Sequence, residues 1–126
     1  MTTIRLHHVS LMVTDLERAR SFYEGILGLR PNPDRPIKTF DGVWYDIGTQ
    51  QIHLIVRDAG VTTTLPSPET YGGMDRHIAV IVSNLEQIRT RLEKAGLNHI
   101  PSRSGRPVMF CRDPDGNGFE LISEVP

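Results

Sequence analysis

Two stretches of the chain alternate between polar and aliphatic residues in the way typical of half-buried β-strands. The first runs from Ile4 to Val13, and the second from Arg76 to Val82. After each strand, apolar residues recur at helical spacing, which predicts a helix with one buried stripe. The stripes comprise Leu16, Ala19, Tyr23 and Ile26 in the first half, and Leu85, Ile88, Leu92 and Ala95 in the second. Each half is therefore predicted to begin with a strand followed by a helix.

Both predicted helices carry start and stop signals. The segments Thr14–Glu17 and Ser83–Glu86 have the S/T-x-x-E form of a capping box, in which the hydroxyl and the Glu side chain satisfy backbone N–H groups at a helix start. Gly28 and Gly96 lie where glycine readily adopts the left-handed conformation that ends a helix. We therefore expect the first helix to begin after Thr14 and the second after Ser83.

Three shorter strands follow each helix. They are expected near Ile37–Phe40, Gly42–Ile47 and Gln51–Val56, and then near Asn98–Ile100, Pro107–Arg112 and Gly118–Ser123. The polar stretch 58–75, with its prolines and paired glycines, is typical of a linker. The pattern predicts an α+β fold of two tandem βαβββ modules in one domain, residues 1–126. The modules cover about 4–57 and 76–124, joined by a linker at about 58–75.

The two modules are also similar in sequence. His8 aligns with His77, a shift of 77 − 8 = 69 residues, and at this shift six of the 17 positions from 8 to 24 are identical. Several of the other pairs exchange one aliphatic residue for another. Such self-similarity indicates a duplicated structural unit. Two copies are too few for a solenoid, so we expect two halves related by pseudo-symmetry.

Composition narrows the function classes. The chain has 126 residues and a formal net charge of −1, and it has no Lys/Arg-rich block, which argues against a nucleic-acid partner. No apolar run approaches the roughly 20 residues that span a bilayer, and the first residues lack the apolar core of a signal peptide. The single cysteine, Cys111, permits no intrachain disulfide. A cytoplasmic protein with a small-molecule partner is the expectation.

Four potential metal ligands lie at equivalent positions of the two modules, off the aliphatic strand faces. They are His8 and His53 in the first module, and His77 and Glu120 in the second. Three imidazoles and a carboxylate suit one divalent ion of Zn, Ni, Fe, Mn or Co. A lone histidine on a strand is more often a hydrogen-bonded pocket residue, but four such residues at symmetric positions favour a metal site. We interpret His7 as structural and leave His99 unassigned.

Three segments of the chain carry a family resemblance: HHVSLMVTDLERARSFYEGILGL, DRHIAVIVSNL and RDPDGNGFELIS. In these segments the sequence resembles the vicinal-oxygen-chelate superfamily, which includes glyoxalase I, fosfomycin-resistance enzymes, extradiol dioxygenases, methylmalonyl-CoA epimerase and bleomycin-resistance proteins. It implies a glyoxalase/bleomycin resistance/dihydroxybiphenyl dioxygenase-like fold, whose paired modules form a curled mixed sheet around a divalent metal. It also implies a homodimer, although one chain could close its own site.

The resemblance assigns His8, His77 and Glu120 to ligand positions of the superfamily. His53 occupies the remaining position, which is Glu in bacterial glyoxalase I and Gln in the epimerase, so histidine there is a departure. Glyoxalase I also has arginines for glutathione where this chain has Met12 and Gly73. Without those guanidinium groups, glutathione loses bidentate partners.

The substrate site is expected to include Met12, Trp44, Arg103 and Arg106. One of Trp44 and Tyr45 faces the metal side of the sheet because strand residues alternate, and Arg103 and Arg106 are possible substitutes for the missing arginines. The alternative interpretation is simple packing for the aromatic pair and solvation for the arginines.

The leading hypothesis is a metal-dependent lyase or isomerase of the glyoxalase I (lactoylglutathione lyase) type. It would act on a small α-oxygenated carbonyl compound, and Glu120 would move a proton between neighbouring carbons. The first alternative is an extradiol-type dioxygenase with a 2-His-1-carboxylate iron site. Further alternatives are a fosfomycin-type thiol transferase and a non-catalytic, drug-sequestering binding protein. Fold analogy alone cannot choose among the enzymes.

Overall fold

The structure, a computed structural model, describes residues 2–36, 39–57, 73–101 and 105–125. The chain divides into two compact units, residues 1–62 and 63–126. Within the described ranges, no helix has the length and apolar character needed to cross a membrane.

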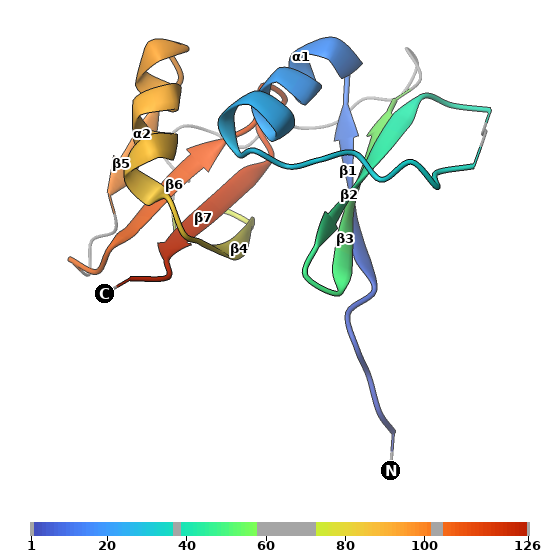
Figure 1. The fold of residues 1–126 in the computed structure, drawn as a ribbon, viewed down its shortest axis with the longest axis horizontal. Helices are drawn as coiled ribbons and strands as arrows, with labels where there is room; N and C mark the ends of the chain where they lie inside the picture. The colour runs from blue at the N-terminus through green and yellow to red at the C-terminus, as the bar shows by residue number, and fades with distance from the viewer. Residues whose placement is uncertain (1, 37–38, 58–72, 102–104, 126) are drawn as a thin grey trace. The chain divides into compact units, whose positions relative to one another are not determined.

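The first unit is a three-stranded mixed sheet with one helical segment (Figure 1). Its elements are β1 (His8–Val13), α1 (Leu16–Arg20), η1 (Ser21–Ile26), β2 (Gly42–Ile47) and β3 (Gln50–Val56). The strand order is β1-β3-β2, with β3 parallel to β1 and antiparallel to β2. The helix widens into π turns over η1, where the Leu27 N–H donates to the carbonyl of Phe22.

The second unit has the same element order with one more paired strand (Figure 1). Its elements are β4 (His77–Val82), α2 (Leu85–Lys94), β5 (His99–Pro101), β6 (Val108–Arg112) and β7 (Gly118–Ser123). The order is β4-β7-β6-β5, with β4 parallel to β7 and the other pairs antiparallel. Two mixed sheets with two helical segments confirm the predicted α+β fold class.

The strand registers make the two units equivalent at the positions of interest. Ser10 pairs with His53 in the first unit, and Ala79 pairs with Glu120 in the second. Ala79 is the repeat partner of Ser10, since 79 − 10 = 69. His53 and Glu120 therefore occupy corresponding places on the last strand of each unit, β3 and β7, as the sequence alignment predicted.

Both helical stripes are largely buried, as expected. Ala19, Tyr23 and Ile26 are buried in the first unit, and Leu85, Ile88 and Leu92 in the second. Leu16 is half-buried and Ala95 is exposed at the end of α2. Gly28 and Gly96 have φ angles of 79° and 69°, the left-handed conformation predicted for them.

The starts of the first strand and of both helices differ from expectation. Strand β1 begins at His8 rather than Ile4, and the side chains of Ile4 and Leu6 are 87% and 63% exposed. Helix α1 is capped by Asp15 rather than Thr14, because the Asp15 carboxylate accepts from the Arg18 N–H at 3.0 Å. The α2 N-cap, Asn84, makes no side-chain capping bond.

The strand expected near Ile37–Phe40 is not confirmed. Residues 37 and 38 lie outside the described residues, and residues 39 and 40 form a bend. Instead, Pro31 forms an isolated antiparallel bridge with Tyr45 on β2. Proline lacks the N–H that a continuing ladder needs, which keeps this edge pairing short.

Candidate metal and substrate site

A cavity of about 310 Å³ opens on the first unit beside two of the predicted ligands. Its lining residues are His7, His8, Arg35, Phe40, Trp44, His53, Leu54 and Ile55. Imidazole and aromatic rings dominate this lining, and Arg35 supplies its permanent positive charge. The cavity therefore combines metal-ligand chemistry with an apolar surface and a cation.

His8 and His53 are in direct contact at this cavity. Their ring centroids are 4.0 Å apart and their planes differ by 15°. Trp44 lies directly opposite His53 in the β2–β3 ladder and stacks on it at 4.4 Å and 9°. Because β3 is the middle strand, the His53 ring lies between His8 and Trp44 and is only 8% exposed. Trp44 is thus the member of the Trp44–Tyr45 pair that faces the candidate site.

A hydrogen-bond chain orients His53. The Gln51 amide nitrogen donates to an Asp46 carboxylate oxygen at 2.9 Å, so the Gln51 carbonyl oxygen faces Nε2 of His53, 2.8 Å away. A carbonyl oxygen only accepts, which assigns the ring proton to Nε2 and the lone pair to Nδ1. The bonds from Gln51 and Asn32 hold the pKa of Asp46 below its usual value.

His7, interpreted as structural from the sequence, lines the cavity together with His8. Nδ1 of His7 is 2.7 Å from Nδ1 of His8. One of the two nitrogens must donate in this contact, so both rings are oriented through Nδ1. The contact leaves Nε2 as the nitrogen of His8 best placed to act as a ligand.

The second unit brings His77 and Glu120 together. Nε2 of His77 is 3.4 Å from Oε1 of Glu120, and the two side chains are 24% and 15% exposed. Nδ1 of His77 is 2.7 Å from the Asp75 carbonyl oxygen, so Nδ1 carries a proton and donates it to that bond. When the ring is neutral, the remaining nitrogen and the carboxylate oxygen face each other as two acceptors, an arrangement that a proton or a metal cation between them stabilises.

This separation fits a metal-binding pair. Two ligand atoms that each lie about 2.1 Å from a tetrahedral metal ion are about 3.4 Å apart. A metal-ligating histidine is also usually oriented by its other ring nitrogen, whose N–H donates to a carbonyl oxygen. The chemistry and spacing of His77 and Glu120 thus suit a divalent ion.

Neighbouring residues hold this second pair in place. Arg112 donates to an Asp75 carboxylate oxygen at 3.0 Å, which steadies the segment whose carbonyl binds His77. Phe110 contacts the His77 ring edge to face at 5.5 Å. A Cβ atom at Gly118 would lie 2.8 Å from the Arg76 carbonyl oxygen and 3.3 Å from Cβ of His77, so glycine permits this close strand pairing.

Each unit therefore unites its own two predicted ligands. Over the ranges that the structure describes, no three His, Cys, Asp or Glu side chains form a metal-binding group. The shared four-ligand site of His8, His53, His77 and Glu120 stays a prediction. Cys111 is buried on β6, and burial raises the pKa of its thiol to about 12.

The expected substrate residues have mixed outcomes. Trp44 lines the cavity, and Met12 is half-buried on β1. Arg106 is exposed ahead of β6, and Arg103 lies outside the described residues. The sequence reasoning missed Arg35, which lines the cavity from a proline-rich segment between the helix and β2. No spacing or repeat signal points to it.

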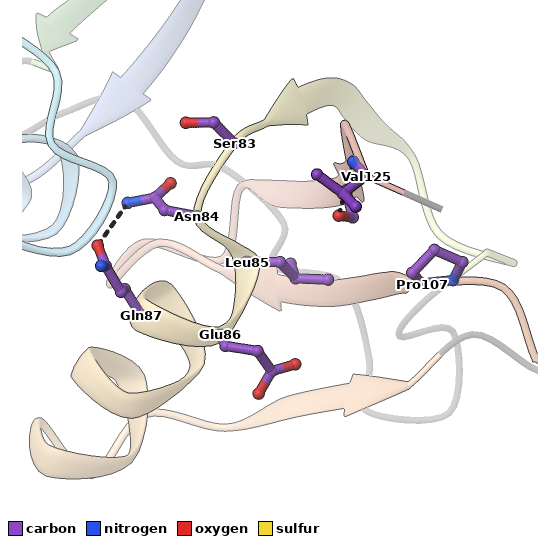
Figure 2. A pocket seen from close by; sticks show the side chains of 8 residues that line it. Ser83, Asn84, Leu85, Glu86, Gln87, Pro107 and Val125 are labelled. Carbon is purple, nitrogen blue, oxygen red and sulfur yellow. Dashed lines mark hydrogen bonds between the residues drawn. The ribbon is translucent and has the colours of Figure 1, made fainter.

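A second cavity, of about 440 Å³, lies in the second unit at the start of α2. Figure 2 shows Asn84 and Gln87 linked across its rim, with Ser83, Leu85, Glu86, Pro107 and Val125 around it. None of the predicted ligands contributes to it. The cavity beside His8 and His53 is therefore the one that matches the predicted chemistry.

A family model described as the Glyoxalase/Bleomycin resistance protein/Dioxygenase superfamily matches residues 5–121. Glyoxylase I 4 of Arabidopsis thaliana is 27% identical over 94% of this chain and 70% of its own length. Human mitochondrial methylmalonyl-CoA epimerase is 29% identical over 90% of this chain and 69% of its own length. Lactoylglutathione lyase of Salmonella typhimurium is 28% identical over 94% of this chain and 92% of its own length.

Solved structures share the fold. The fosfomycin resistance protein FosX from Mesorhizobium loti has a TM-score of 0.70 and 25% identity, over 96% of this chain and 92% of that one. FosX from Listeria monocytogenes, solved with Mn(II) and a dihydroxypropylphosphonic acid, has a TM-score of 0.71 at 19% identity. It covers 97% of this chain and 93% of its own, and at this identity the likeness concerns the fold alone.

Proposed function

Because the chain belongs to the Glyoxalase/Bleomycin resistance protein/Dioxygenase superfamily, we propose that it is a metal-dependent lyase or isomerase of glyoxalase I type. Its substrate is a small α-oxygenated carbonyl compound. The observation that carries the proposal is the His77–Glu120 pair, whose 3.4 Å separation and fixed imidazole tautomer suit a divalent ion. His8 and His53, at the equivalent positions of the first unit, complete the proposed ligand set.

Each proposed site residue has a role that follows from the chemistry of its side chain. The three imidazoles and Glu120 would hold a Zn, Ni, Fe, Mn or Co ion, which would supply Lewis-acid stabilisation of negative charge that develops on the substrate. Glu120 accepts a proton from the carbon beside the carbonyl and returns it to the neighbouring carbon. Trp44 and Phe40 give the cavity an apolar wall that limits water near the reacting atoms.

One observation favours a second candidate with three ligands. Imidazole lone pairs lie in the ring plane, and the planes of His8 and His53 are stacked and differ by 15°. Two such rings cannot both direct a lone pair at one cation unless one of them rotates. If His53 keeps its place between His8 and Trp44, then His8, His77 and Glu120 form a 2-His-1-carboxylate set. That set suits an extradiol-type dioxygenase or a fosfomycin-type thiol transferase.

The decisive experiment measures metal content, metal affinity and turnover together. The protein is purified without chelator, supplied with Zn, Ni, Mn or Fe(II), and assayed for hemithioacetal isomerisation, catechol cleavage and thiol addition to fosfomycin. We expect roughly one metal per site and hemithioacetal turnover with Ni or Zn. Metal binding close to zero with every ion would contradict the proposal and favour a drug-sequestering binding protein.

His53→Ala separates the two candidates. In a four-ligand lyase it should lower metal affinity by more than about 100-fold, since even loss of an outer-shell partner costs 10–100-fold. In the three-ligand enzymes the affinity should change little. His99→Ala is the matched control, because His99 contacts Glu93 at 3.2 Å rather than any proposed ligand.

Two companion proposals concern assembly and location. We propose a homodimer, as the family resemblance implies, which light scattering of the purified protein tests. We also propose a cytoplasmic location, because the only cysteine, Cys111, is buried and can form no intrachain disulfide.

A further inference from the structure

The cavity of the first unit has an unbalanced charge. Arg35 contributes a permanent positive charge to its lining, and none of the lining residues carries a carboxylate. Within the described part of the chain, Arg35 forms no ion pair with Asp or Glu. A half-buried guanidinium without a counter-charge attracts an anion, since desolvated charges are stabilised by partners of opposite sign.

Arg35 is held in place without neutralising its charge. One terminal nitrogen, Nη2, donates to the Phe40 carbonyl oxygen at 2.9 Å, and the guanidinium carbon lies 5.7 Å from the centre of the Phe40 ring. A Cβ atom at Gly42 would lie 3.1 Å from the same nitrogen, so the absence of a side chain there leaves room for it. Nε is buried and has no hydrogen-bond partner among the described residues. These contacts orient the group but leave its charge for a ligand.

The surroundings define the kind of anion. Phe40, Trp44 and Ile55 give the same cavity an apolar wall. A single guanidinium matches a monoanion in charge, and its planar shape suits the two oxygens of a carboxylate. A phosphate dianion is normally met by several positive charges, and Arg35 is the single permanently charged residue of this lining.

We propose that Arg35 binds the carboxylate of a small, partly apolar monocarboxylic acid in this cavity. This inference adds a substrate class to the proposed function. It rests on that function for one point, that the molecule in the cavity is the substrate. The carboxylate on Arg35 would place the rest of the molecule beside His8 and His53, which line the same cavity. Arg35 would then set substrate specificity in place of the arginines that Met12 and Gly73 replace.

The test measures binding to metal-free protein, so its result does not depend on metal loading or turnover. Trp44 is the only tryptophan of the chain and lines the cavity, so its fluorescence reports occupancy. The probe pair is cyclohexanecarboxylate and the uncharged cyclohexanecarboxamide, titrated by Trp44 fluorescence and calorimetry. We expect the carboxylate to bind at least about tenfold more tightly than the amide, as loss of a charged hydrogen bond predicts.

Substitutions of Arg35 test whether this residue causes the preference for the carboxylate. Arg35→Met should abolish the preference for the carboxylate, Arg35→Lys should retain part of it, and the exposed Arg30→Ala should leave it unchanged. Equal binding of both probes to the wild type, no binding of either, or an unchanged preference in Arg35→Met would each overturn the proposal. Tighter binding of cyclohexylphosphonate than of the carboxylate would overturn the choice of a carboxylate. Since the wild-type comparison needs no variant, an unstable Arg35→Met protein does not prevent the test.

Discussion

Single hydrogen bonds decide which atoms the candidate site presents. The Asp75 carbonyl oxygen fixes the proton of His77 on Nδ1, and the Gln51 amide fixes that of His53 on Nε2. Neither acceptor is itself a proposed ligand. The two histidines therefore present different lone-pair nitrogens, Nε2 in His77 and Nδ1 in His53, although both lie on equivalent strand pairs.

Glu24 is a residue whose hydrogen-bond partners change its pKa. Its carboxylate accepts from Arg20 one turn earlier and from the buried Tyr45 hydroxyl at 2.8 Å. The Arg20 bond is the main cause of a pKa for Glu24 below its usual 4.5. A carboxyl group with a lowered pKa in the folded state stabilises the fold above the unfolded-state pKa. That contribution fades as the pH falls through the folded-state value.

We expect Glu24→Gln to lower the free energy of unfolding by about 1 kcal/mol at pH 7, allowing for the 28% exposure of the side chain. At pH 3 the difference between the two proteins should shrink, because this pH lies below the usual carboxyl pKa of 4.5, where the contribution of a lowered folded-state pKa begins to be lost. Urea unfolding at both pH values measures it. A difference that stays constant with pH would show that the charge of Glu24 is not the cause.

At the scale of elements, each parallel strand pair positions one ligand pair. Strands β1 and β3 carry His8 and His53, and β4 and β7 carry His77 and Glu120 on the same face. Strand residues two apart lie on one face, so the register alone brings these side chains close. A shift of the register by one residue would turn one ligand to the other face.

Gly118→Ala tests this close pairing. The new Cβ atom would press on the Arg76 carbonyl oxygen, so β4 must move at His77. We expect a loss of about 1–3 kcal/mol in the free energy of unfolding and weaker metal binding. Gly25→Ala is the control, because a Cβ atom there meets nothing within 4 Å and helical alanine is favoured over glycine. Equal stability of the two variants would contradict the packing argument.

At the scale of the whole molecule, the proposed metal links residues that are distant in sequence. The first of them is His8 and the last is Glu120. A ligand that binds only the folded state raises its stability by about 2.7 kcal/mol at 100 times its dissociation constant. For a chain of 126 residues, we expect saturating Zn or Ni to raise Tm by about 4–15 °C.

The control for this shift is a double variant, His77→Ala with Glu120→Ala. It should show little change in Tm with metal, and a chelator should reverse the shift in the wild type. Thermal unfolding followed by circular dichroism measures both. An equal shift in the double variant would mean that the metal binds elsewhere.

The alternation of residues along each strand and the repeat of 69 residues were enough to predict much of this protein. Both are periodic, local signals, and they correctly placed the helical stripes, the turn glycines and the alignment of His53 with Glu120. Periodicity works there because strand and helix geometry fix which side chains share a face.

Tertiary structure decided the features that depend on the path of loops and on ring orientation. The bridge from Pro31 to Tyr45 and the position of Arg35 in the cavity each follow from contacts that no repeat or spacing encodes. The stacking of His53 between His8 and Trp44 likewise needed three strands side by side. Sequence periodicity specifies the face on which a side chain lies. Which atoms meet on that face is decided by packing between segments far apart in the chain.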